Sequence, residues 1–290
     1  MTELKEILGK YKYIEKHYAP FLSKFSKINH PLIELLINEN NKKEFLKDFD
    51  EQLKRLDKLK DLSHLIKESR NPENFWPTVS EIKIMSFLID NVDDKSIIIP
   101  DDPSPDFKIK KSNVEITIEV KKIIDKYECG KVEFLDESKT IFTEENVKTM
   151  LSAITESIKR GQYYPSIPHI LIFDCSSGID ESEFEDVLYP QKEKVIQAKN
   201  NQGNFLDLFG HSAYNGLFYK TNDRGEFPYQ MISGIVAFFE RGITYFDEDE
   251  EKIIVKSPRK IFFENPNASD EVKVPKNIIK SLGFQIHKIF

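Results

Sequence analysis

Residues 105–122, PDFKIKKSNVEITIEVKK, consist of two alternating apolar and charged runs that meet at a polar turn. Such alternation is typical of β-strands with one buried face. A two-residue turn at Ser112 and Asn113 fixes the register by counting. We therefore predict a β-hairpin in which Asp106 is opposite Glu119.

The two faces of this predicted hairpin differ in chemistry. Asp106, Glu119 and Lys121 share the face at the end away from the turn, because side chains alternate with period 2 and opposed residues lie about 5 Å apart. The same face pairs Lys108 with Thr117 and Lys110 with Glu115, the latter as an expected ion pair. The other face is apolar and is predicted to pack on a core: Phe107, Ile109, Val114, Ile116, Ile118 and Val120.

Composition indicates a globular chain that is long enough to bury a substantial core. The 290 residues are 39% hydrophobic and 31% charged, without an apolar run of the ~20 residues that span a bilayer. The N-terminus lacks the apolar segment of a secretory signal, so we expect a cytoplasmic protein. Cys129 and Cys175 lie far apart and the six histidines are scattered, which disfavours a disulfide framework, a structural zinc site or a histidine-rich metal site.

The net charge of −7 leaves the identity of the partner open. Acidic residues gather at 180–186 and 247–251, whereas residues 1–75 are slightly basic and the hairpin carries several lysines. Nucleic-acid affinity depends on local phosphate contacts rather than on total charge. An acidic chain can therefore still bind nucleic acid.

Residues 1–72 are predicted to form a helical N-terminal region. An apolar stripe at spacings of three and four predicts an amphipathic helix that packs on the next domain, with a short dimerising coiled coil as the alternative. Pro20 and Pro31 are expected to separate shorter helices upstream. The stripe consists of Leu46, Phe49, Leu53, Leu56, Leu59, Leu62 and Ile66.

Residues 71–77, NPENFWP, are predicted to break the chain and to mark a domain boundary. Thr78 or Ser80 can then cap a helix that begins near Glu81. Glu81 would lie in its first turn, where a carboxylate also stabilises the helix dipole. Because the helix dipole alone would explain a glutamate here, Glu81 indicates a functional site only together with other residues.

The rest of the chain alternates between further strands and helices. We expect strands at 96–100, 131–135 and 168–175, the last of them central and buried on both faces. A helix from Thr143 to about Gly161 carries Lys159 and Gln162 on or near its polar stripe. Beyond it we expect an acidic helical stretch at about 181–198 that is interrupted at Pro190, strands at 231–240, 242–246, 252–256 and 259–263, and a helix at 276–282.

This order of helix, three strands, helix and strand resembles the PD-(D/E)xK nuclease superfamily, which has the restriction-endonuclease-like fold. Pro105 and Asp106 supply the "PD", Glu119 to Lys121 supply the "ExK", and Glu81 corresponds to a glutamate that many members carry on the first core helix. The resemblance implies an α/β fold with an αβββαβ core and a mixed central sheet at residues 73–178. Residues 179–290 would then form a C-terminal α/β extension.

The resemblance also implies roles for these residues. Asp106, Glu119 and the carbonyl of Val120 offer the hard oxygen ligands that suit Mg²⁺ or Mn²⁺. Asp106, Glu119, Lys121 and Glu81 are the predicted catalytic residues. Lys159, Gln162 and Lys122 are expected to contact nucleic acid.

The function predicted from these features is metal-dependent hydrolysis of phosphodiester bonds, most simply in DNA, by a chain that can act as a homodimer. The alternative is a module on the same fold that binds nucleic acid or protein without cutting it. Chemistry driven by ATP is not expected, because the sequence contains neither GxxxxGK[ST] nor GxGxxG.

Overall fold

A computed structural model gives the structure of the protein. The structure describes residues 2–22, 29–59, 62–93, 96–100, 105–122, 166–175, 184–185, 188–189, 195–199, 205–209, 216–219, 221, 224–239, 243–247, 250–254 and 259–287. The strand expected at 131–135 and the helix expected from Thr143 to Gly161 lie outside the described residues.

The contacts of the chain divide it into two compact units. The first unit comprises residues 1–122 and 280–283, and the second comprises residues 123–279 and 284–290. The division into domains at residues 72 and 178 stays a prediction, because a compact unit of contacts does not by itself define a functional domain.

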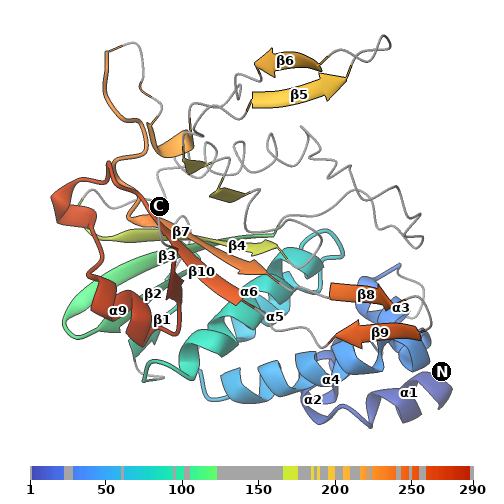
Figure 1. Cartoon of the computed structure of the whole chain (residues 1–290). Helices are drawn as coiled ribbons and strands as arrows, with labels where there is room; N and C mark the ends of the chain where they lie inside the picture. The colour runs from blue at the N-terminus through green and yellow to red at the C-terminus, as the bar shows by residue number, and fades with distance from the viewer. Residues whose placement is uncertain are drawn as a thin grey trace. The chain divides into compact units, whose positions relative to one another are not determined.

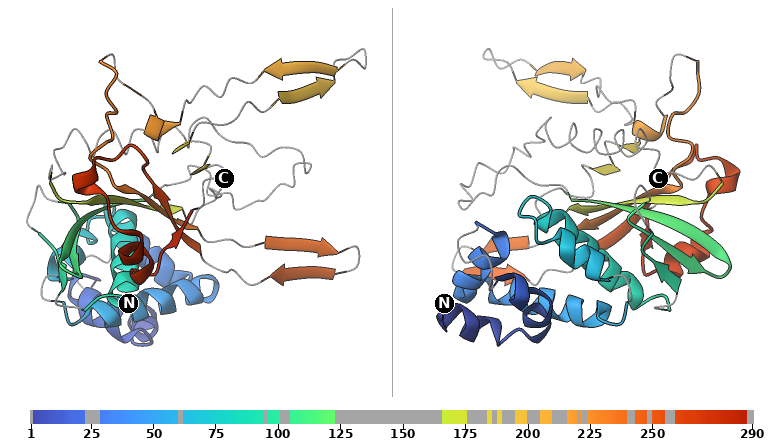
Figure 2. Two further views of the ribbon diagram at one scale, coloured as in Figure 1. Left: turned by 60° about the vertical axis from the view of Figure 1, so that its left-hand side comes forward. Right: turned by 180° about the vertical axis from the view of Figure 1, so that it is seen from behind.

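The first unit begins with a group of helices, as the sequence predicts. They are α1 (Thr2–Leu8), α2 (Lys12–Leu22), α3 (Pro31–Ile37), α4 (Glu39–Leu56), α5 (Leu62–Glu68) and α6 (Phe75–Ile89). Helix α4 packs against α2, α3 and α6, and Figure 2 shows α6 between the other helices and the hairpin. Among the described helices of the chain, none is long and apolar enough to cross a membrane.

Two details of the helical prediction are corrected. The apolar stripe does not follow one helix, since α4 ends at Leu56 and α5 begins at Leu62. Pro20 does not separate two helices but lies inside the last turn of α2. Pro31 is the first residue of α3, a position where its missing N–H has no helical partner.

Buried polar contacts fix the helices to one another. Asp50 Oδ1 of α4 accepts hydrogen bonds from the backbone N–H groups of Tyr13 and Ile14, at 2.7 and 2.8 Å, and so caps the start of α2. His30 caps α3, and its Nε2 lies 3.0 Å from the carbonyl oxygen of Ser69, just after α5. These contacts join α4 to the start of α2, and the residue after α5 to the start of α3.

Helix α6 begins earlier than the sequence predicts. Its first residue is Phe75, which is fully buried, so the break between α5 and α6 ends at Asn74 rather than at Pro77. Pro77 fits the first turn because the N–H that it lacks would have no acceptor there. Thr78 and Ser80 are buried residues within the helix rather than caps.

This shift changes the meaning of Glu81. The residue lies in the second turn of α6 rather than in the first. Favourable interaction with the helix dipole falls off within the first turn. The dipole therefore does not account for a carboxylate at this position.

The hairpin has the predicted register. Strands β1 (Ile97–Ile98), β2 (Phe107–Lys111) and β3 (Val114–Lys122) pair in antiparallel fashion, with Phe107 opposite Ile118 and Lys111 opposite Val114. Ser112 and Asn113 have φ angles of 49° and 65°, and a type I′ turn requires positive values at both positions. The predicted hairpin is confirmed (Figure 1).

Both faces of β3 are covered along its centre. Ile116, Ile118 and Val120 are buried on the predicted apolar face. Thr117 and Glu119 are buried on the opposite, polar face, and α6 packs against this strand. Glu119 is therefore not a solvated surface residue.

The second unit contains a mixed sheet, which agrees with the α/β class. Strands β4 (His169–Cys175), β7 (Gly234–Phe239), β10 (Arg259–Glu264) and β11 (Gln285–Ile286) follow one another in this order. The β4–β7 and β10–β11 pairs are parallel and the β7–β10 pair is antiparallel. Two hairpins join β5 (Val195–Lys199) to β6 (Phe205–Phe209) and β8 (Ile243–Asp247) to β9 (Glu250–Ile254).

Most elements predicted for the second unit are confirmed. Strands β7 to β10 match the expected strands, and α9 (Lys276–Ser281) matches the expected C-terminal helix. The acidic helix expected at 181–198 is wrong at its end, where Val195 and Ile196 belong to β5. β-Branched residues favour strands, and β6 supplies the hydrogen-bonding partner.

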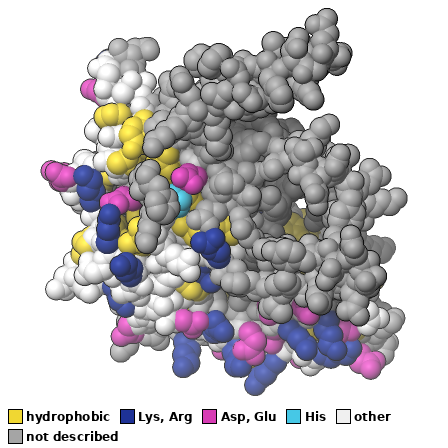
Figure 3. Space-filling view, viewed as in Figure 1, with side chains coloured by type: hydrophobic (Ala, Val, Ile, Leu, Met, Phe, Trp, Pro, Cys, Tyr) yellow, Lys and Arg dark blue, Asp and Glu magenta, His cyan; other side chains and the backbone are white. Residues whose placement is uncertain are grey.

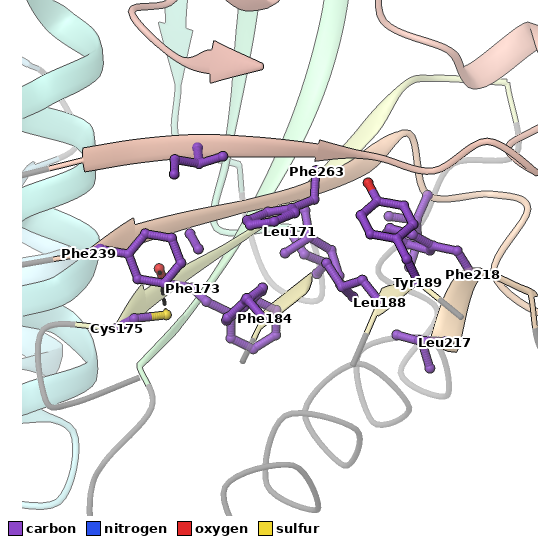
Figure 4. Close-up of a cluster of buried hydrophobic side chains, with 14 residues drawn as sticks. Leu171, Phe173, Cys175, Phe184, Leu188, Tyr189, Leu217, Phe218, Phe239 and Phe263 are labelled. Atoms are coloured by element: carbon purple, nitrogen blue, oxygen red, sulfur yellow. Dashed lines mark hydrogen bonds between the residues drawn. The ribbon is translucent and has the colours of Figure 1, made fainter. Parts of the chain in front are cut away.

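Aromatic rings fill the core beside this sheet (Figure 4). The ring of Phe184 lies 5.8 Å from those of Phe173 and Phe239 and 5.4 Å from that of Phe263, measured between centroids. All seven residues of β4 are buried. The predicted strand at 168–175, buried on both faces, is therefore confirmed.

Charges of both signs are interspersed on the face that Figure 3 shows. Described Lys and Arg side chains alternate there with Asp and Glu, most clearly along the lower edge of the view. The described part of this face forms no extended basic patch. On this face, contact of the described residues with a polyanion would therefore be local.

Candidate functional site

The predicted site residues meet at the end of the hairpin away from the turn. Asp106 directly precedes β2, and its Oδ2 accepts a hydrogen bond of 2.6 Å from the backbone N–H of Val120. Lys121 Nζ donates to Glu119 Oε1 at 2.5 Å. The two carboxylates and the lysine thus converge as the register predicts, while their chemical roles stay predictions.

Glu119 is unusual for a charged side chain, because only 1% of its surface is exposed. Its Oε1 binds Lys121, but its Oε2 has no hydrogen-bond partner among the described residues. A buried polar atom without a partner costs about 1–3 kcal/mol, and more when it is charged. Glu119 Oε2 is therefore a candidate ligand for a cation.

Asp106 is half-buried, and its environment opposes ionisation. Burial, followed by the negative charge of Glu119, raises the pKa of Asp106 to about 7. The Val120 N–H and the Lys121 ammonium lower the pKa but do not outweigh these causes. The carboxyl group therefore changes its charge near neutral pH.

Glu81 of α6 belongs to the same electrostatic cluster. Burial raises its pKa well above the ordinary value, and the charges of Asp106 and Glu119 add to this effect. Lys121 acts in the opposite direction. The predicted grouping of Glu81 with the hairpin residues is thus supported by mutual electrostatic influence.

Glu68, the last residue of α5, is a member of the cluster that the sequence did not predict. Its charge contributes to the raised pKa of both Glu81 and Asp106. In the sequence Glu68 was one of many charged residues on the polar side of a helical stretch. Only the break between α4 and α5, together with the position of α6, brings it toward the hairpin.

The predicted nucleic-acid contacts have different outcomes. Lys122 Nζ lies over the ring of Trp76, 4.6 Å from its centre. Lys159 and Gln162 lie outside the described residues. Near the turn, Lys110 and Glu115 are opposite each other, but the ion pair that forms joins Lys108 to Glu115 at 3.9 Å.

Within the described ranges, no group of three or more His, Cys, Asp or Glu side chains is already arranged to hold a metal ion. One oxygen of Asp106 accepts from Val120, and one oxygen of Glu119 accepts from Lys121. The buried Glu119 Oε2 nevertheless fits a divalent cation. With the Asp106 carboxyl group it offers oxygen atoms, the donors that Mg²⁺ and Mn²⁺ prefer, while the Val120 carbonyl stays a predicted ligand.

Comparison of the chain with protein-family models, curated proteins and solved structures finds no match. Any statement about function therefore rests on the geometry of the site.

Proposed function

We propose that this chain is a nuclease that uses Mg²⁺ or Mn²⁺ to hydrolyse phosphodiester bonds. The observation that carries the proposal is the unpartnered, buried Glu119 Oε2 next to Asp106 and Lys121. A buried cluster of carboxylates with raised pKa values is costly to maintain, and such clusters are frequent at functional sites. DNA as the substrate and pairing of two chains rest on the resemblance alone.

In the proposed site, Asp106, Glu119 and the Val120 carbonyl would hold the divalent ion. When bound, the ion supplies charge that polarises a phosphate oxygen and lowers the pKa of a coordinated water. The hydrogen bond from Val120 keeps Asp106 in position for this task. Burial of Glu119 excludes water and strengthens its interaction with a cation.

Lys121 and Glu81 would act on the reacting groups. Hydrolysis forms a bond between a water oxygen and phosphorus, breaks one ester P–O bond, and transfers a proton from the water to the leaving oxygen. The Lys121 ammonium orients the attacking water and stabilises the negative charge that develops on the phosphate. Glu81, whose pKa is raised well above its ordinary value, orients the water or exchanges a proton.

The test is cleavage of linear, circular and single-stranded DNA and of RNA by the purified chain with Mg²⁺ or Mn²⁺. Asp106→Ala and Lys121→Ala are expected to abolish cleavage. Lys110→Ala is the matched control, because Lys110 is an exposed lysine on the same hairpin. Cleavage that persists unchanged in both site variants would contradict the proposal.

A module that binds without cutting is the competing outcome of the same experiment. Such a module would shift the electrophoretic mobility of oligonucleotides with or without the divalent ion, and it would cleave none of the substrates. The raised pKa of Asp106 would then reflect only the electrostatic cost of its position.

A further inference from the structure

Trp76 and Lys122 form an aromatic and cationic pair beside the candidate site. Lys122 Nζ lies 4.6 Å from the centre of the Trp76 ring, and both side chains are half-buried, so part of each reaches solvent. Lys122 directly follows Lys121 on β3. Trp76 lies on α6, five residues before Glu81.

The Trp76 ring is held in place by other rings. Phe45 and Phe75 contact it edge to face, at centroid distances of 5.6 and 5.2 Å. Phe75 is itself fully buried. A ring that is already ordered loses little conformational freedom when a ligand stacks on it. Trp76 is therefore better suited to stacking than a mobile surface aromatic.

The link between Trp76 and the candidate site is β3 rather than the spacing along α6. Trp76 and Glu81 are about 7.5 Å apart along the helix axis but about 140° apart around it, so their side chains leave the helix in different directions. Lys122, which contacts the Trp76 ring, directly follows Lys121 on β3, so the two lysine Cα atoms are about 3.8 Å apart. A nucleic-acid strand with one phosphate near Lys121 would therefore have a neighbouring phosphate within reach of Lys122 and a base within reach of Trp76.

We propose that Trp76 and Lys122 form a binding subsite for an unpaired nucleotide next to the phosphate that is cleaved. Lys122 contacts a phosphate of the strand. The base stacks on the face of the Trp76 ring that the Lys122 ammonium covers in the free protein. This exchange is favoured because stacking of a base on an aromatic ring outweighs a partly hydrated cation–π contact. The subsite rests on the proposed function, since it presumes a nucleic-acid substrate.

An unpaired nucleotide is the ligand that this geometry favours. In a duplex, both faces of an internal base are already stacked on its neighbours, so the ring could not reach them without unstacking the base. In a single strand the base faces are accessible. We therefore expect a preference for single-stranded over double-stranded DNA at this subsite.

Trp76 is the only tryptophan of the chain, so tryptophan fluorescence, excited at wavelengths that tyrosine does not absorb, reports on this ring alone. The experiment titrates the full chain, in EDTA to prevent cleavage, with poly-dA and poly-dT oligonucleotides of about 12 nucleotides and with the corresponding duplex. We expect saturable quenching of the Trp76 emission by the single strands and much less by the duplex. Anisotropy of labelled oligonucleotides measures binding independently.

Substitutions separate stacking from folding. Trp76→Phe keeps a ring against Phe45 and Phe75, whereas Trp76→Leu removes the stacking surface, and circular dichroism checks that both variants fold. Loss of stacking in Trp76→Leu should weaken single-strand binding about 5- to 150-fold, with a smaller loss in Trp76→Phe. Lys122→Gln should reduce the slope of log K against log salt by about 0.7 for a single strand.

Two results would overturn the subsite. One is single-strand binding that leaves Trp76 emission unchanged and is equally tight in Trp76→Leu. The other is absence of any oligonucleotide binding at low salt. Cleavage is scored separately through Asp106: a chain that binds through Trp76 but never cleaves would overturn the proposed function and leave the subsite intact.

Discussion

The Asp106 carboxylate accepts a hydrogen bond of 2.6 Å from the backbone N–H of Val120. This contact ties the start of β2 to the residue that follows Glu119, and so holds the two carboxylates near each other. Their repulsion contributes to the raised pKa of Asp106, which is a cost to the stability of the folded chain. A divalent cation at this position would remove that cost.

Asp106→Asn is expected to stabilise the chain at neutral and alkaline pH. In the folded chain Asp106 keeps its proton up to a pKa of about 7, whereas in the unfolded chain it loses the proton near 3.8. The folded state thus binds more protons between these values, and the free energy of unfolding falls as pH rises from about 4 to about 7. Asn does not ionise, so the variant does not lose this free energy of unfolding as pH rises. We therefore expect its melting temperature to be a few degrees above that of the wild type at pH 8 and little changed at pH 4.

Thermal unfolding of both proteins at pH 4 and pH 8 checks this expectation. Glu115→Gln is the matched control, since Glu115 is an exposed carboxylate on the same hairpin. An equal shift of the melting temperature by Asp106→Asn at both pH values would show that the charge of Asp106 is not the cause.

Mg²⁺ or Mn²⁺ is expected to stabilise the wild-type chain in a pH-dependent way. A ligand at 100 times its dissociation constant stabilises the folded state by about 2.7 kcal/mol. Because the cation binds the deprotonated carboxyl group, the rise in melting temperature should be larger at pH 8 than at pH 6. Asp106→Asn and Glu119→Gln should each abolish most of it.

K⁺ serves as the comparison in the same thermal experiment. K⁺ at matched ionic strength should give no comparable rise, because the site offers carboxylates that favour a divalent ion. A rise in melting temperature that Asp106→Asn and Glu119→Gln leave unchanged would place the cation elsewhere on the chain.

The hairpin could be predicted from sequence because its determinants are local. Alternation with period 2 sets the faces, and a two-residue turn with positive φ at Ser112 and Asn113 sets the register. From these two facts the proximity of Asp106 and Glu119 follows by counting. No contact distant in sequence was needed.

The parts that were wrong or missed depend on tertiary packing. Residues 71–77 contain the usual signals of a break, but the burial of Phe75 extends α6 through Pro77. Glu81 therefore lies in the second turn of its helix rather than in the first. Glu68 carries no local signal, since its influence on Asp106 depends on how α5 and α6 pack.

His30 is expected to make the helical part of the chain sensitive to acid. Its Nδ1 accepts the N–H of Leu32 at 3.1 Å, so the proton of the neutral ring is on Nε2, which faces the carbonyl of Ser69. Burial lowers the pKa of His30 below its ordinary value of 6.5. The unfolded chain then binds a proton before the folded chain does, so stability present above pH 6.5 is lost as pH falls.

His30→Asn tests this dependence, because Asn can still cap α3 but does not titrate. We expect the variant to be less stable at pH 7, by about 1–3 kcal/mol for the lost buried contact, and to lose less stability between pH 7 and pH 5. Chemical denaturation at both pH values measures this difference. His64→Asn is the control, since the His64 side chain is 61% exposed; an identical acid response in wild type and His30→Asn would contradict the expectation.

Lys121→Met is expected to separate catalysis from metal binding. The substitution removes the ammonium that lies 2.5 Å from Glu119 Oε1, and leaves a carboxylate buried without that partner. We expect cleavage to fall at least about 100-fold, as when a charge-stabilising donor is lost. Without metal the variant should be less stable by about 1–3 kcal/mol. Mg²⁺ should raise its melting temperature more than that of the wild type, because both oxygens of Glu119 are then available to the cation.

Lys110→Met is the matched control for Lys121→Met, because it removes an exposed lysine of the neighbouring strand. Exposed charges contribute at most about 1 kcal/mol, so both stability and cleavage should change little. Cleavage rates and melting temperatures with and without Mg²⁺ distinguish the two variants. If Lys121→Met cleaves at the wild-type rate while Mg²⁺ still stabilises it, Lys121 serves only to neutralise Glu119, and the stabilisation of the phosphate must come from another residue.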